Sequence, residues 1–151
     1  MANIVPDSFK AELLAGSHNF EYGVSGQTFK LALYVTTLGP PYTTSSTVYS
    51  TDNEVSSSGT NYTAGGNALA LASASGSVPG SNTAVVDFDN ETFSNVTLTS
   101  LGAAIYNSST TPANMLVLIL DFGGAKSATS GDFTIQFPLP TAAAAIIRLG
   151  D

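Results

Sequence analysis

Turn-forming residues interrupt this chain at short intervals, and their spacing limits the chain to short segments of regular structure. Gly accepts positive φ, Pro fixes φ, and Asn and Ser bind their own backbone, so clusters of these residues mark turns. The clusters stand at Ser56-Ser57-Ser58-Gly59, Gly65-Gly66-Asn67, 76–80, 107–112 and Gly123-Gly124. A chain divided in this way favours short strands over packed helices.

The clearest strand is expected at 28–35, where the hydrophobic period is two. Large apolar residues alternate there with other residues, as on a strand with one buried face; they are Phe29, Leu31, Leu33 and Val35. Gly39-Pro40-Pro41 ends this pattern because proline cannot continue a ladder. Further strands are expected at 47–50, 68–72, 83–88, 93–98, 103–106, 115–121, 132–137 and 143–149.

About nine short strands with hardly any helix predict an all-β fold. We expect a single β-sandwich domain over 1–151, jelly-roll-like, with a closed barrel as the alternative. The stretch 43–64 is expected to be a long ordered surface loop with a hairpin. One short helix is expected at 7–15, because Pro6 and Asp7 suit a first helical turn and Gly16 suits its end. Residues 1–16 would then be an N-terminal arm with a short helix, which either covers the core or docks on a neighbour.

Charge and composition exclude several classes of function. The chain has 4 Lys and Arg residues against 11 Asp and Glu residues, a formal net charge of -7. Binding to nucleic acid or to an anionic membrane needs clustered cations, so we expect neither. No cysteine is present, so stability must come from packing without disulfides. The most apolar run, Met115 to Leu120, is too short for a membrane helix of ~20 residues and suits a buried strand.

Few residues could carry chemistry, and we expect no enzyme. His18 is the single histidine, no Gly-x-Ser-x-Gly motif occurs, and a loop histidine is expected at the surface. Three carboxylates recur at every second position: Asp87, Asp89 and Glu91. In an extended segment they would point the same way and could bind calcium, the one cofactor considered. The alternative is a solvated strand end with Phe88 turned inward.

Several stretches resemble small virion structural proteins of tailed bacteriophages. The similarity spans most of the chain and rests on strand and turn signatures: 5–16, 26–34, Tyr62-Thr63-Ala64-Gly65-Gly66, 104–108, Leu120-Asp121-Phe122-Gly123 and 131–138. A β-sandwich of this size is similar to capsid decoration, or cement, proteins. The resemblance implies a dimer or trimer that binds the major capsid protein on the outer capsid surface and bridges its subunits. It implies synthesis in the host cytoplasm and no catalytic residues.

The terminal segments are the expected docking surfaces for such a role. Their apolar or cationic residues are Ile4, Val5 and Phe9 at the start, and Ile146, Ile147 and Arg148 at the end. The alternative is that they complete the core of the domain itself. Two other functions compete with capsid decoration. One is a tail, neck or short-fibre component that contacts a receptor, and the other is a carbohydrate-binding or enzymatic domain outside any virion.

Overall fold

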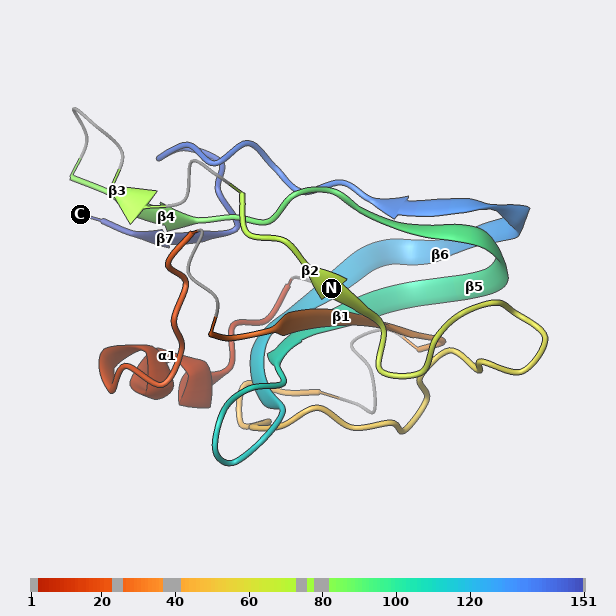
Figure 1. Ribbon diagram of the computed structural model, residues 1–151, viewed down its shortest axis with the longest axis horizontal. Coiled ribbons are helices and arrows are strands. Elements are labelled where there is room, and N and C mark those ends of the chain that lie inside the picture. The colour runs from red at the N-terminus through yellow and green to blue at the C-terminus, as the bar shows by residue number, and fades with distance from the viewer. Residues whose placement is uncertain (1–2, 23–25, 37–41, 73–75, 78–81, 151) are drawn as a thin grey trace.

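The computed structural model describes residues 3–22, 26–36, 42–72, 76–77 and 82–150. These residues form one helix and seven strands (Figure 1): α1 (Asp7–Leu14), β1 (Phe29–Tyr34), β2 (Asn67–Leu69), β3 (Gly76–Ser77), β4 (Ala84–Val86), β5 (Glu91–Asn107), β6 (Met115–Ile135) and β7 (Ile147–Leu149). A four-stranded sheet has the order β2-β1-β5-β6, and a three-stranded sheet has the order β3-β4-β7. All strand pairs are antiparallel. The expectation of a mostly β protein with one short N-terminal helix is confirmed.

Two long strands replace four of the short strands expected from the sequence. β5 and β6 pair from Glu91 opposite Ile135 to Asn107 opposite Met115. The expected turn at Gly123-Gly124 lies inside β6 and does not end the strand. Ser100 pairs with Lys126 and Gly102 pairs with Asp121, so the four residues 122–125 of β6 stand opposite the single residue Leu101 of β5. Both glycines have positive φ, 69° and 149°, so they allow a bulge that bends the ladder without ending it. Figure 1 shows both strands curving back together at the right of the view.

The other expected strands are shorter than the sequence indicated. The segment 47–50 makes only an isolated bridge, from Val48 to Met115, and the segment 42–66 forms no hairpin of its own. The segment 143–149 is reduced to β7, because residues 142–144 form a turn. The described residues therefore contain seven strands where about nine were expected. The expected strand end at Gly39-Pro40-Pro41 lies outside the described residues.

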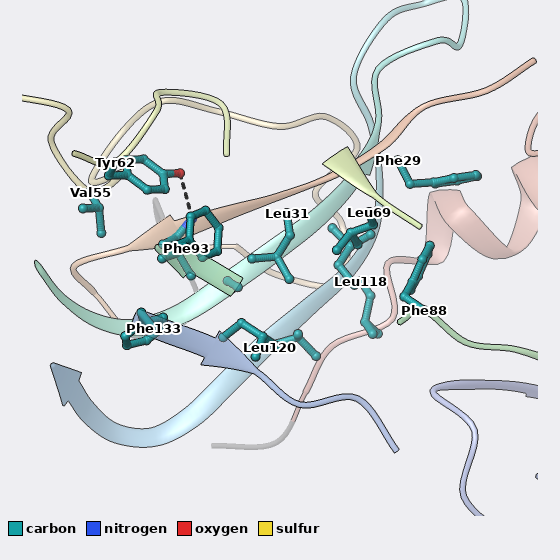
Figure 2. Close-up of a cluster of buried hydrophobic side chains, with 14 of the residues drawn as sticks. Phe29, Leu31, Val55, Tyr62, Leu69, Phe88, Phe93, Leu118, Leu120 and Phe133 are labelled. Carbon is teal, nitrogen blue, oxygen red and sulfur yellow. Dashed lines mark hydrogen bonds between the residues drawn. The ribbon is translucent and has the colours of Figure 1, made fainter. Parts of the chain in front are cut away.

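The main core lies on one face of the four-stranded sheet. From β1 it receives Phe29, Leu31 and Leu33, as the alternation at 28–35 predicts. The fourth residue of that pattern, Val35, lies beyond the end of β1 and is 47% exposed, so the prediction is wrong for this position. Phe93 and Phe133 contribute to the same cluster from the curved-back parts of β5 and β6. Figure 2 shows these side chains directed toward one another, with residues from four strands and from the segment 42–66. The bend of the β5–β6 ribbon therefore lets one pair of strands supply both sides of the core.

The opposite face of the same sheet is also buried, which the sequence did not predict. Ala32 and Tyr34 of β1 pack there in a second apolar cluster with residues of β5 and β6. Tyr42 belongs to this cluster, and Tyr49 and Ile4 pack against it. The expectation that β1 has one buried and one exposed face is wrong, since the segment after β1 and the N-terminal segment cover its second face.

The N-terminal segment lies against the rest of the protein. Ile4 pairs with Ile119 of β6 through two backbone hydrogen bonds of 2.9 Å. Phe9 of α1 is 2% exposed, and its ring lies 5.2 Å from the ring of His18. Gly16, with φ of 74°, follows the helix end as predicted. The segment 3–16 thus covers part of the domain, in agreement with the first of the two roles considered for it.

Candidate functional site

A groove of about 500 Å³ lies between α1 and β7, and we call it the terminal groove. It brings together residues from the two ends of the chain. Its lining consists of Val5, Phe9, Lys10, Leu13, Leu14, Ile146, Ile147, Arg148 and Leu149. Figure 1 shows α1 and β7 at the same end of the molecule, at the left of the view.

The walls of the terminal groove are apolar side chains that water reaches. Leu14 is 89% exposed, Leu149 is 57% exposed and Val5 is 38% exposed. Phe9 is buried beneath them, and Leu13 and Ile147 pack partly against the main core. The groove therefore has a floor that belongs to the core and a rim of exposed large apolar residues. A rim of this kind is typical of a surface that contacts another molecule.

β7 forms one side of the groove and is an edge strand. Among the residues that the structure describes, it pairs with β4 along one side only, with Val86 opposite Ile147 and Ala84 opposite Leu149. Four consecutive residues, 146–149, line the groove. Successive side chains of a strand point to opposite faces, so a groove lined by all four runs along the open edge of β7.

Asp87 holds the start of β7 in place. Its side chain is fully buried and accepts hydrogen bonds from the backbone amides of Phe88, at 2.9 Å, and Ile146, at 3.3 Å. Burial raises the pKa of the Asp87 carboxyl, while the two amide hydrogen bonds oppose that change. Because the Asp87 carboxylate accepts a hydrogen bond from the backbone amide of Ile146, it positions the residue that directly precedes β7.

Two cationic side chains line the terminal groove of this otherwise acidic protein. Lys10 and Arg148 are two of only four basic residues in a chain of net charge -7, and none of the described residues that line the groove is a carboxylate. Lys10 is bound to exposed Asp7 at 2.8 Å. Arg148 donates hydrogen bonds to the carbonyl oxygens of Ala143, at 2.8 Å, and Ala142, at 3.4 Å. Within the described residues, the Arg148 guanidinium thus has no anionic partner.

Five of the six docking residues expected from the sequence line this one groove. They are Val5, Phe9, Ile146, Ile147 and Arg148. The sixth, Ile4, extends the sheet beside β6 instead. Phe9 is too deeply buried to contact a partner. Phe9 and Ile4 therefore contribute to the fold of the domain itself, which was the alternative to docking.

The sequence did not point to the most exposed apolar residues of the groove, Leu14 and Leu149. A signal for Leu14 was present, because Lys10 and Leu14 are four residues apart on one helix face. No local signal links Leu149 to α1, since the two segments meet only in the folded chain.

The three carboxylates considered for calcium do not gather. Asp87 is buried within the fold, whereas Asp89 is exposed. Glu91 accepts a hydrogen bond of 2.7 Å from the side-chain amide of Asn67. The described part of the chain holds no group of three or more residues placed to bind a metal ion. Of the alternative, a solvated strand end with Phe88 turned inward, the buried Phe88 is confirmed, but the solvated end is wrong for Asp87, which is fully buried.

His18 is buried, contrary to the expectation of a surface histidine. Its ring binds Glu12 through Nε2 at 3.0 Å and Asn107 through Nδ1 at 3.1 Å. The Asn107 side-chain amide nitrogen also donates to Gln27 at 2.8 Å. Because that nitrogen is a donor, Nδ1 accepts and Nε2 carries the hydrogen bound to Glu12. His18 therefore joins the segment after α1 to the end of β5.

A second hollow, of about 630 Å³, lies between β6 and the segment 136–146. Three phenylalanines line it, Phe122, Phe133 and Phe137, together with Lys126 and Asp121. It is larger than the terminal groove. The terminal groove is the better candidate for docking because it runs beside an open strand edge and has strongly exposed apolar walls.

Comparison with known proteins finds no family model, curated protein or solved structure that matches this chain. No helix among the described residues is both long enough and apolar enough to cross a membrane.

Proposed function

We propose that this protein is a structural component of a tailed-phage particle that decorates the outer surface of the capsid. The observation that carries the proposal is the terminal groove, in which both ends of the chain form one exposed apolar surface with a cationic border. The resemblance of the strand and turn signatures to small virion proteins supplies the class of partner. The role proposed is docking, with no reaction catalysed.

The physical argument for a capsid decoration role is that the capsid offers many identical binding sites. A capsid lattice presents many symmetry-related copies of one site, so an oligomer that binds several of them gains avidity from modest individual contacts. We propose a dimer or trimer whose partner is the major capsid protein. The two antiparallel sheets are compatible with a jelly-roll-like sandwich, which we retain as part of this proposal.

Location on the particle tests the proposal first. Gold-labelled antibody against the purified protein should mark the whole surface of the phage head. Labelling confined to the tail would support a tail, neck or fibre component instead and would end the decoration proposal.

A second experiment tests the surface that binds. Capsids stripped of this protein are incubated with the purified chain or with a variant that carries Leu14→Asp and Leu149→Asp, and bound protein is measured after sedimentation. The double variant should bind poorly while melting normally, because both side chains are exposed. Leu139→Asp is the matched control, since Leu139 is 73% exposed but lies outside the groove. Full occupancy by the double variant would contradict docking through the terminal groove.

A shortened chain tests the N-terminal segment separately. A chain that lacks residues 1–7 should still fold, although with a lower melting temperature because it loses the pairing of Ile4 with Ile119. It should bind the stripped capsids less well at a temperature where it remains folded, because it loses Val5 from the groove. Full occupancy by this shortened chain would show that the N-terminal segment takes no part in attachment.

A further inference from the structure

The open edge of β7 could bind a partner by pairing with an added strand. β7 is the last strand of its sheet, so the edge away from β4 has no strand partner among the described residues. An unpaired edge is a template for an added strand, and the terminal groove runs beside this one. The main-chain hydrogen bonds of an added strand would supply affinity, and the groove would select its side chains.

The side chains of β7 define what such a strand must carry. Ile147 and Leu149 share one face of β7, and Arg148 points to the other. An added strand places its own side chains beside these on the same faces. Apolar residues beside Ile147 and Leu149 would fill the groove, and a carboxylate beside Arg148 would meet a guanidinium that has no anionic partner in the described residues. The matching sequence alternates apolar and acidic residues.

Charge also argues against a second copy of this chain as the occupant. In a symmetric pairing of two β7 edges, the central residue, Arg148, would face its own copy. Like charges placed directly opposite on paired strands are destabilising.

We propose that the terminal groove is a strand-addition site for an extended segment of a partner protein in which apolar and acidic residues alternate. The inference deepens the proposed docking role and rests on it. In the capsid setting, the segment belongs to the capsid subunit.

The test uses the full chain and synthetic peptides followed by nuclear magnetic resonance. The probe is a short peptide of alternating Val and Glu. One control peptide carries Lys in place of Glu, and a second keeps the side chains but has N-methylated backbone amides. The Val-Glu peptide should shift the amide signals of residues 146–149 and of α1, while the Lys peptide binds at least about tenfold more weakly. The N-methylated peptide should not bind, because it cannot form a ladder.

Variants of the protein identify the groups that act. Arg148→Gln removes the cation and should weaken binding of the Val-Glu peptide about tenfold, which corresponds to about 1.4 kcal/mol. Lys126→Gln is the matched control, since Lys126 is exposed on β6 and does not line the terminal groove. Melting curves of both variants verify that they fold.

Each contrary outcome overturns the proposal in its own way. Equal binding of the N-methylated peptide would show that side chains dock without a strand ladder. Equal binding of the Lys peptide would remove the acidic specificity, and absence of binding by the Val-Glu peptide would remove the site. Self-association in sedimentation that Leu149→Asp abolishes would assign the groove to a second copy. Gold labelling on the phage head is independent of these results, so the decoration proposal can stand or fall separately.

Discussion

The carboxylate of Glu54 accepts a hydrogen bond of 2.7 Å from the hydroxyl of Tyr62. The same tyrosine oxygen accepts the backbone amide of Leu33 in β1, at 3.0 Å. Tyr49 donates to the other Glu54 oxygen, and the amide of Gly65 donates to the first at 2.6 Å. One carboxylate thus ties together three parts of the hydroxyl-rich segment 42–66, and Tyr62 in turn holds that segment against β1. Figure 2 shows Tyr62 and Phe93 close together at one end of the main core.

Replacing Glu54 should destabilise the protein although Glu54 lies outside the terminal groove. Glu54→Ala leaves the hydroxyls of Tyr49 and Tyr62 without their acceptor. The lost partner of the buried Tyr62 hydroxyl costs about 1–3 kcal/mol, and the half-buried Tyr49 hydroxyl adds less. Urea denaturation should show the decrease in unfolding free energy. Asp52→Ala is the control, because Asp52 is exposed and its carboxylate forms no hydrogen bond with another described residue. Equal stability of the two variants would refute this role of Glu54.

Stability should fall at alkaline pH because of the buried tyrosines. Burial raises the pKa of Tyr106 from 10.0 to about 12, and burial raises the pKa of Tyr62 further. A tyrosine whose pKa is higher in the folded than in the unfolded protein contributes its full stabilisation at pH values below its pKa in the unfolded protein. This contribution is lost as the pH rises from that pKa through the higher pKa of the folded protein. The unfolding free energy should therefore decrease from about pH 10 upward. Denaturation at a series of pH values checks this, with tyrosinate absorbance as the signal.

A Tyr106→Phe variant serves as the control for this pH series. It removes one of the titrating groups, so its unfolding free energy should fall less steeply between about pH 10 and pH 12. An identical pH profile would show that Tyr106 does not contribute.

Gly66 should tolerate no side chain. Its φ is +71°, and an added Cβ would collide with the backbone carbonyl of Leu31. Gly66→Ala should therefore disrupt the contact between β1 and the segment that precedes β2, and lower the melting temperature strongly. Gly59→Ala is the matched comparison, because Gly59 has φ of +72° but open space around it, so only the left-handed backbone cost of about 1–2 kcal/mol applies. Similar melting of both variants would contradict the close approach.

Leu118→Asp should unfold the protein. Leu118 is 3% exposed in β6 and belongs to the main core, so the substitution buries a charge without a partner. Leu139→Asp introduces the same charge at a site that is 73% exposed and should leave the melting temperature unchanged. Circular dichroism distinguishes the two, and a soluble Leu118→Asp protein with normal melting would mean that this core position is misassigned.

The parts of the fold that the sequence predicted are those with a local physical cause. The alternation of Phe29, Leu31 and Leu33 predicted β1 because a strand places every second side chain on one face. Pro6 and Gly16 predicted the limits of α1 because their backbone preferences act on their immediate neighbours.

The course of β6 through Gly123-Gly124 could not be predicted in the same way. Positive φ suits both a turn and a bulge, and which one forms depends on the pairing with β5. The second buried face of β1 likewise depends on a distant segment, since Ile4 and Tyr49 cover it.

By itself, the sequence determined a mostly β protein with an acidic surface, one short helix and apolar terminal segments. Only the tertiary structure decided that Val5 and Leu14 stand beside Leu149 in one groove, along the open edge of β7. The physical reason is that backbone preference and hydrophobic period act over a few residues. The meeting of the two ends requires the whole core between them to fold.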